Sequence, residues 1–368
     1  MIIKIYEKSI EDLKKNELLR SLNIYDESFI DFSSNDYLNL SKNEDVIKAG
    51  YEAAIRYGAG STGSRLISGN KAIFEQFESF ILKDKNTENA LIFNSGFNAN
   101  LGALEALLKK DFVVVFDKLN HSSMYQGVFL SKAKLLRYNH LDYDQLEDIL
   151  KEQKGQNIVI ASETVFGMDG DKADVGILSN LSNKYNAMLY LDEAHATGLY
   201  GKFGYGLSTD YNLDNERTVI MGTFSKALGA SGAYIACSNL IKEYLVQKCK
   251  SFIYSTSISP FCIGAAMYSW KLIKSLEENR QKLLVLADKL REGIRKTGYE
   301  VKGQGTNIVV IIFSNTKEML EKKQHFLKNK IIVSGIRYPT SPTPRIRIAI
   351  NDFHTENDIS ALLKVFNS

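Results

Sequence analysis

Two neighbouring strands expected in this 368-residue chain end in residues that can do chemistry. One apolar run ends at Asp192 and is followed by His195, and the next ends near Thr223 and is followed by Lys226. In a parallel sheet, ligands collect at the carboxyl ends of the strands, so these side chains should converge on one crevice. Pyridoxal phosphate (PLP) needs a lysine that binds it covalently and an acid that keeps its ring nitrogen protonated. Asp192 and Lys226 can supply that pair, although a lysine after a strand is often only a solvated strand end.

The same stretch also contains the DEAH string of helicases and related nucleotide triphosphatases, from Asp192 to His195. An enzyme of that kind needs a phosphate-binding loop of the form GxxxxGK[ST], whose lysine reaches the terminal phosphates. The nearest glycine-rich stretch, from Gly58 to Arg65, has Ser64 where that lysine belongs. The sequence therefore argues against a nucleotide triphosphatase.

A third element starts where an apolar strand passes through Ser95 and Gly96 into a helical stretch that includes Phe97. Backbone N–H groups and the helix dipole at such a junction bind phosphate, although the same pattern is often only a helix cap. His121 either caps a helix start or stacks on a cofactor ring. None of the five histidines has metal-ligand spacing and no CxxC pair occurs, so no metal site is expected.

Near the C-terminus, Arg345 and Arg347 alternate with apolar residues and should lie on the same face of a strand. Such a face is commonly solvated. The alternative is that one guanidinium binds a substrate carboxylate with two hydrogen bonds, to which its planar fork is suited.

Short β-branched runs alternate with helical patterns over the first two thirds of the chain, which indicates βαβ units around a mostly parallel sheet. A long helix with Leu283, Leu286, Leu290 and Ile294 on one face should follow, and then a smaller unit with strands of its own. The expected strands of the large unit are Ala90–Phe93, Phe112–Phe116, Lys134–Tyr138, Asn157–Ser162, Ala187–Asp192, Thr218–Gly222 and Gly232–Cys237. The expected division is an N-terminal segment 1–40, a large cofactor-binding domain 41–270 and a small C-terminal domain 271–368.

Composition favours a soluble, cytoplasmic protein. The chain is 44% hydrophobic and 24% charged, and its 46 basic and 43 acidic residues give a net charge of +3. Such a balance provides no field of one sign for nucleic acid or a membrane surface. The longest apolar run, Ile308–Phe313, is too short to cross a bilayer, and three cysteines without pair spacing fit a reducing compartment.

Taken together, these strings resemble the α-oxoamine synthases, which are fold type I PLP-dependent transferases. The resemblance runs from about Asp31 to the end of the chain. It is carried by Asp31–Leu38 (DFSSNDYL), Ser68-Gly69, Ser95–Asn100 (SGFNAN), Asn120–Ser123 (NHSS), Met168–Asp171 (MDGD), Asp192–Gly198 (DEAHATG), Thr223–Lys226 (TFSK), Tyr254–Ser257 (YSTS) and Arg345–Ile348 (RIRI). It implies an α/β fold with a mostly parallel central sheet, helices on both faces and a smaller C-terminal α/β domain.

The resemblance also implies roles for the cofactor-binding residues. Lys226 would bind PLP covalently, Asp192 would bind the ring nitrogen and His195 the phenolic oxygen, while His121 would lie against the ring. These four residues form the expected catalytic set. The phosphate would be held by Ser95, Gly96, Phe97, Thr223 and Thr256.

The resemblance also implies which residues bind the substrate and how the protein assembles. Asn35 and Arg347 would bind the carboxylate of the amino acid, and Arg20 is assigned to the substrate as well. Thr256 would arrive from a second subunit, because the family builds its sites across a homodimer interface.

Three positions depart from the pattern of the family. Gly167 stands where a serine hydroxyl commonly reaches the phenolic oxygen, so His195 alone is expected to do that work. Phe74 stands where histidine is common, and Asn39 replaces a usual glycine.

The implied reaction is the decarboxylative condensation of an amino acid with an acyl thioester carried by CoA or an acyl carrier protein. The DFSSNDYL opening is most similar to the enzymes that join L-alanine to a pimeloyl thioester in biotin synthesis. The shared residues do not separate this reaction from those of family members that use glycine or serine. An aminotransferase on the same fold would share many of these residues, and so would a non-catalytic partner subunit, although Lys226 argues against the latter.

Overall fold

The computed structural model describes residues 2–368, and the chain divides into two compact units. The larger unit comprises residues 36–166 and 172–280. The smaller comprises the N-terminal segment up to Asn35, residues 167–171 and residues 281–368. The expected bounds at residues 40 and 270 lie near these divisions, but the N-terminal segment 1–40, whose first residue lies outside the described part, does not form a unit of its own.

The larger unit is built on a seven-stranded sheet with strand order β2-β8-β7-β6-β5-β3-β4. The strands β3 to β7 are parallel to their neighbours within this group, and β8 runs antiparallel to both β7 and β2. Their bounds are β2 Asn89–Phe93, β3 Phe112–Asp117, β4 Lys134–Tyr138, β5 Asn157–Glu163, β6 Met188–Asp192, β7 Thr218–Thr223 and β8 Ala233–Cys237. All seven predicted strands are confirmed within one residue at each end.

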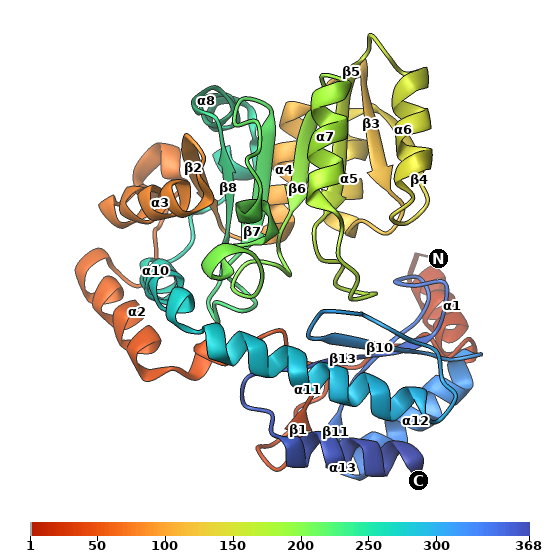
Figure 1. The fold of residues 1–368 in the computed structure, drawn as a ribbon. Coiled ribbons are helices and arrows are strands. Elements are labelled where there is room, and N and C mark those ends of the chain that lie inside the picture. Colours follow the sequence, from red (N-terminus) through yellow and green to blue (C-terminus); the bar gives the residue numbers. More distant parts are fainter. Residues whose placement is uncertain (1) are drawn as a thin grey trace. The chain divides into compact units, whose positions relative to one another are not determined.

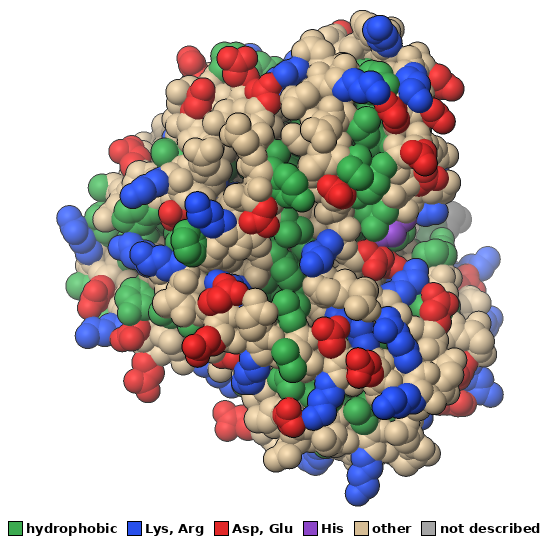
Figure 2. Space-filling model, in the orientation of Figure 1, with side chains coloured by type: hydrophobic (Ala, Val, Ile, Leu, Met, Phe, Trp, Pro, Cys, Tyr) green, Lys and Arg blue, Asp and Glu red, His purple; other side chains and the backbone are tan. Residues whose placement is uncertain are grey.

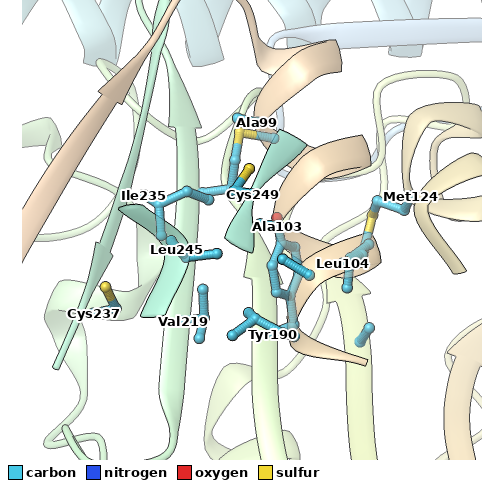
Figure 3. Packing of buried hydrophobic residues seen from close by; sticks show 14 of the residues in the cluster. Ala99, Ala103, Leu104, Met124, Tyr190, Val219, Ile235, Cys237, Leu245 and Cys249 are labelled. Atoms are coloured by element: carbon cyan, nitrogen blue, oxygen red, sulfur yellow. The ribbon is translucent and has the colours of Figure 1, made fainter. Parts of the chain in front are cut away.

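Helices cover both faces of this sheet (Figure 1). On one face, side chains of α4 (Gly96–Leu107), α5 (Ser122–Ser131), α8 (Asn239–Lys248) and α9 (Lys250–Ile253) pack on alternate strand residues. Figure 3 shows Ala103 and Leu104 of this layer facing Tyr190 and Val219 of the sheet. On the other face lie α6 (Tyr143–Glu152) and α7 (Val175–Lys184). The predicted fold type I architecture is therefore confirmed.

The remaining helices of the larger unit are α2 (Glu44–Tyr57), α3 (Ala72–Lys85) and α10 (Pro260–Leu272). Shorter turns of 3₁₀ or π helix are η1 Leu40–Lys42, η2 Arg65–Gly69, η3 Lys202–Gly204, η4 Leu207–Asp210 and η5 Ile273–Ser275.

The smaller unit contains a four-stranded antiparallel sheet of order β12-β13-β10-β9 and a parallel pair β1-β11. Its strands are β1 Ile30–Asp31, β9 Val301–Lys302, β10 Ile308–Ile312, β11 Ile331–Ile332, β12 Ser334–Ile336 and β13 Arg345–Ala349. Its helices are α1 (Ile2–Lys15), α12 (Thr316–Lys328), α13 (Glu356–Asn367) and the part of α11 (Glu277–Arg295) that follows residue 280. The predicted apolar face of α11 is confirmed, since Leu283, Leu286, Leu290 and Ile294 are buried.

The directions of the strands determine where a site can form. The carboxyl ends of β5, β6 and β7 lie at the same edge of the sheet, because these strands are parallel and Asp192 pairs in register with Glu163 and Met221. The strand β2 is antiparallel to β8, which is itself antiparallel to β7, so β2 also ends at this edge. The loop after β2 carries Ser95.

The charged side chains are mixed in sign over the face shown in Figure 2, in keeping with the net charge of +3. Within residues 2–368, none of the helices combines the length and the apolar character that crossing a membrane requires.

A buried histidine in the smaller unit gives a pH-dependent stability. The ring of His354 is fully buried, stacks on Phe32 with 4.0 Å between centroids and accepts a 2.9 Å hydrogen bond from the Asn351 N–H. Burial lowers its pKa from 6.5 to about 4, against the opposing effect of Asp358. Between these values the unfolded chain binds a proton that the folded chain excludes, so stability falls as the pH falls from 6.5 towards 4.

We expect this effect to reach roughly 3 kcal/mol, from about 1.4 kcal/mol per unit of pKa difference. Urea unfolding at pH 7 and pH 4.5 measures it. The His354→Gln variant should be less stable at pH 7 and should lose less stability on acidification. An equal loss in both proteins would contradict the assignment to His354.

Candidate active site

A cavity of about 250 Å³ lies at the carboxyl edge of the seven-stranded sheet. Its lining comes from the ends of β5, β6 and β7, from the loop after β2 and from the first turns of α4 and α5. The lining residues are Ser95, Gly96, Phe97, Asn100, His121, Ser123, Glu163, Asp192, Ala194, His195, Met221, Thr223, Ser225 and Lys226. The structure thus brings together every predicted cofactor-binding residue except Thr256.

Asp192 is buried at the end of β6, and its carboxylate is held by two donors. The Asn100 Nδ2 donates to Oδ2 at 2.7 Å, and the Ala194 backbone N–H donates to Oδ1 at 2.9 Å. Asn100 is itself fixed, because the Tyr190 hydroxyl donates to its Oδ1 at 2.8 Å. The orientation of the carboxylate is therefore set by a chain of buried hydrogen bonds before any ligand binds.

Lys226 lies in the tight turn that follows β7. The Phe224 N–H donates to the Gly232 carbonyl at 2.9 Å, and the Gly229 N–H donates to the Lys226 carbonyl at 2.9 Å. The buried ring of Phe224 anchors the turn. These contacts hold the backbone of Lys226 at the wall of the cavity that Asp192 also lines.

Two histidines complete the wall. The Nδ1 atom of His195 is 2.7 Å from the Tyr37 hydroxyl, and that hydrogen bond fixes the orientation of the ring. His121 caps α5, and its Nδ1 accepts from the Ser123 N–H at 3.3 Å. Although His121 borders the open cavity, desolvation lowers its pKa below the ordinary 6.5; Lys226 lowers the pKa further, and Asp192 opposes both effects. His121 therefore favours its neutral form near pH 7.

The start of α4 offers a place for a phosphate. Ser95 caps the helix by accepting from the Asn98 N–H at 3.2 Å, and the first N–H groups of a helix have no intrahelical acceptor. A Cβ atom at Gly96 would lie 3.6 Å from the Thr223 Cβ, so this backbone closely approaches the end of β7. The Thr223 Oγ1 is 2.7 Å from the Ser225 hydroxyl. Backbone donors, hydroxyls and a helix N-terminus converge here, which is how proteins bind phosphate.

Thr256 lies outside this cavity in its own chain. Its side chain is exposed, and its carbonyl accepts from the Asn94 Nδ2 at 3.3 Å. This position leaves the predicted contribution from a second subunit as a proposal.

The predicted substrate residues belong to the smaller unit. The Arg347 Nε donates to the Gly167 carbonyl at 2.5 Å, and its Nη2 donates to the Asn35 Oδ1 at 2.9 Å. The Arg345 Nη1 instead lies 2.7 Å from the Asp169 carboxylate. Both arginines are buried, so this strand face is not solvated: β13 is the second strand in from one edge of a sheet whose residues pack inside the unit.

Arg20 is not placed with these two arginines. It is exposed, and its Nη2 donates to the Thr340 hydroxyl at 3.3 Å. Its assignment to the substrate stays a prediction.

Several lining residues were not predicted from the sequence, namely Asn100, Ser123, Ser225 and Glu163. The first three lie within the strings that carried the resemblance, so their polar side chains next to expected cofactor residues were an available signal. Glu163 had a weaker signal, as the last residue of a strand that ends at the same edge as Asp192.

The three departures have local explanations. Asn39 has φ 54° and ψ 31°, the left-handed conformation that asparagine tolerates better than most residues other than glycine. Phe74 is fully buried, with the Arg65 guanidinium 4.7 Å from its ring centroid. Gly167 contributes its carbonyl oxygen to Arg347, a contact that does not depend on a side chain.

The donor set of the cavity fits PLP. The ring nitrogen needs an anion, the aldehyde needs a lysine amine and the phosphate needs clustered N–H and hydroxyl donors. The cavity provides Asp192 with fixed orientation, Lys226, and the first turn of α4 beside Thr223.

Comparison with known proteins agrees with this geometry. A model of the family described as aminotransferase class I and II matches residues 27–366. The "Putative 8-amino-7-oxononanoate synthase" of Methanocaldococcus jannaschii is 38% identical over 362 residues, covering 96% of this chain and 95% of that protein.

Two solved structures are also similar. The 8-amino-7-oxononanoate synthase of Francisella tularensis is 31% identical, with a TM-score of 0.82 over 93% of this chain and 97% of that chain. A serine palmitoyltransferase determined with PLP is 27% identical, with a TM-score of 0.87 over 92% and 86% of the two chains.

The chain belongs to the aminotransferase class I and II family of fold type I enzymes, and within that family it is an α-oxoamine synthase. It is accordingly a PLP-dependent enzyme that transfers an acyl group to an amino acid.

Proposed function

We propose that this enzyme condenses L-alanine with a pimeloyl thioester to give 8-amino-7-oxononanoate, CO₂ and the free thiol, a step of biotin synthesis. The observation that carries the choice among α-oxoamine synthases is the 38% identity to the archaeal relative over almost the whole of both chains. The acyl donor is a thioester of CoA or of an acyl carrier protein.

The resemblance supplies the proposed roles of the cavity residues, and their gathering around one cavity supports these roles. PLP, when bound, supplies an aromatic ring that accepts electrons from the substrate Cα. Asp192 would hold the proton on the ring nitrogen, and its two fixed donors would keep its carboxylate aligned for that contact. His195, oriented by Tyr37, would donate to the phenolic oxygen, and His121 would lie against the ring. The start of α4 and Thr223 would hold the phosphate.

Lys226 has two proposed tasks. It would bind the cofactor covalently in the absence of substrate, and its amine would remove the Cα proton as a general base. Arg347 and Asn35 hold the amino-acid carboxylate. The Cα then bonds to the thioester carbonyl, the thiol leaves and the carboxyl group departs as CO₂. Lys226 returns a proton to Cα before the product is released.

Product analysis with alternative substrates tests this proposal. Thiol release should be fastest with alanine and a pimeloyl thioester in a panel that also includes glycine, serine, acetyl-CoA, succinyl-CoA and palmitoyl-CoA. Faster turnover with glycine or serine would move the enzyme to another α-oxoamine synthase reaction. Exchange between amino and keto acids without thiol release would indicate an aminotransferase.

We further propose a cytoplasmic homodimer in which Thr256 completes the phosphate site of the partner subunit. Two features support it: the Thr256 side chain is exposed, and α2 presents an exposed apolar stripe of Ile47, Tyr51 and Ile55 at intervals of four residues. Because hydrogen bonds to charged groups contribute about 1.5–3 kcal/mol, Thr256→Val should weaken PLP binding by about tenfold or more.

Subunit mixing distinguishes a contribution across the dimer from one within a chain. Co-expressed Thr256→Val and Lys226→Ala chains form hybrids in which one site has both native residues if Thr256 acts across the interface. Spectroscopic titration should then recover one site of native PLP affinity per hybrid. Recovery of none would place the role of Thr256 within its own chain.

A further inference from the structure

A buried ion pair lies beneath the cofactor-binding residues. Lys85, the last residue of α3, contacts Glu193, which directly follows Asp192. Both side chains have 0% exposure. Neither residue lines the cavity, and neither has a role in the function proposed above.

The pair is fully supplied with hydrogen bonds. Besides Glu193, the Lys85 ammonium donates to the Tyr205 carbonyl at 2.7 Å and to the Ser208 hydroxyl at 2.9 Å. The Glu193 carboxylate accepts from the Ser208 N–H at 2.7 Å and from its hydroxyl at 2.9 Å. A buried pair of this kind repays its desolvation only with such complete partners, and losing one member leaves an uncompensated charge.

The surrounding backbone is shaped around the pair. Gly206 has φ +106°, and a Cβ atom there would collide with the Glu193 carboxylate and lie 2.8 Å from the Lys85 Nζ. Burial lowers the pKa of Lys85, and Glu193 opposes that change. The backbone at residue 206 therefore packs directly against the pair and leaves no room there for a side chain.

Glu193 connects this pair to the site through its own backbone. Its N–H donates to the Met221 carbonyl at 2.7 Å, and its carbonyl accepts from the Ala196 N–H at 2.9 Å and the Thr197 N–H at 2.8 Å. These backbone hydrogen bonds tie residues 192–197 to β7 and hold them in a turn next to the buried Glu193 carboxylate. Asp192 lies directly before this anchor, and His195 lies two residues after it.

We propose that Lys85 and Glu193 are positioning residues: their ion pair fixes the turn that carries Asp192 and His195, and so orients both side chains toward the cofactor. This inference rests on the proposed function. A substrate-binding role is not implied, because both side chains are inside the protein.

The test uses Glu193→Gln, which removes the charge and keeps the shape, and Lys85→Met, which removes the ammonium. The matched control is Leu150→Ala, a fully buried residue of α6 in the core on the α6–α7 face.

All proteins are measured with PLP at a temperature at which circular dichroism shows them folded. Because small misplacements of catalytic groups cost up to about a hundredfold in rate, kcat should fall by about tenfold to a hundredfold in the ion-pair variants, with little change in KM for the amino acid. The control should keep its kcat.

A second readout needs no cofactor. NMR of ¹³C,¹⁵N-histidine-labelled protein prepared without PLP follows the ring chemical shifts of His195, assigned with a His195→Gln variant. These shifts should change in Glu193→Gln, because the turn that carries the ring and its contact with Tyr37 are displaced, and should stay in place in Leu150→Ala. Equal kcat values and unchanged His195 ring shifts in Glu193→Gln would overturn the proposal, even if Lys85→Met fails to fold. Absence of PLP binding and thiol release in the native enzyme would instead count against the proposed function, and the His195 ring shifts would still decide the positioning role.

Discussion

Replacing Lys226 with alanine should abolish thiol release from the acyl donor while the protein stays folded. The loss should be about a thousandfold or more, because one amine is expected both to bind the cofactor covalently and to move the Cα proton. The fold should survive because backbone hydrogen bonds hold this turn, among them those from the Gly229 N–H to the Lys226 carbonyl and from the Phe224 N–H to the Gly232 carbonyl.

Three measurements separate this result from a general loss of function. The native protein should show a visible absorbance band with PLP that borohydride bleaches, and peptide mass spectrometry should then find the reduced adduct on Lys226. In Lys226→Ala both signals should be absent, while circular dichroism is unchanged. The matched control is Lys250→Ala, whose ammonium is exposed and pairs with Glu105 on the surface.

Two outcomes would change the assignment. Persistent thiol release in Lys226→Ala would place the base elsewhere in the cavity. Absence of the absorbance band from the native protein would revive the non-catalytic partner subunit as the better account of this chain.

Much of this site could be predicted because it depends on local pattern and strand direction. The apolar runs before Asp192 and Thr223 are short and continuous, as those of buried parallel strands are. Once two such strands are assigned to one sheet, their carboxyl ends must meet, and the residues that follow them must share a cavity. Ser95 and Gly96 were predicted from a different local pattern, a strand that passes directly into a helix whose first N–H groups can bind phosphate.

The contacts that orient these residues could not be predicted in the same way. Tyr37 reaches His195 across 158 positions of sequence, and Lys85 reaches Glu193 across 108. Nothing in the local pattern of α3 marks Lys85, the last residue of an ordinary amphipathic helix, as a buried partner. Side-chain hydrogen bonds between distant elements depend on packing that periodicity alone does not determine.

The partners of the two arginines of β13 also could not be predicted from the sequence pattern. Their alternation correctly predicted a strand with both side chains on one face, but not the partners of each arginine. Arg345 lies 2.7 Å from Asp169, which is also 3.3 Å from Lys302. Arg347 donates to the Gly167 carbonyl and to the Asn35 Oδ1. Asn35 is the other residue proposed to bind the substrate carboxylate, so its contact with Arg347 supports the proposal of Arg347 over Arg345 for that role.

Arg347→Ala should therefore raise the KM for the amino acid by about a hundredfold, with a smaller effect on kcat. A buried, hydrogen-bonded charge pair between guanidinium and carboxylate costs about 2–5 kcal/mol when one partner is removed, and tenfold corresponds to about 1.4 kcal/mol. Arg347→Lys should fall between the native enzyme and Arg347→Ala, because lysine keeps the charge and loses the planar fork. Initial-rate kinetics with the thioester at saturation measure both variants.

Arg345→Ala is the matched control on the same strand face. It should lower thermal stability, because Asp169 is 3% exposed and would lose the nearer of the two cations, Arg345 and Lys302, that pair with it. Its KM for the amino acid should stay within a few-fold of the native value at a temperature at which it is folded. The opposite pattern, with KM unchanged in Arg347→Ala and raised in Arg345→Ala, would transfer the carboxylate site to Arg345. It would also mean that the ion pair with Asp169 opens when substrate binds.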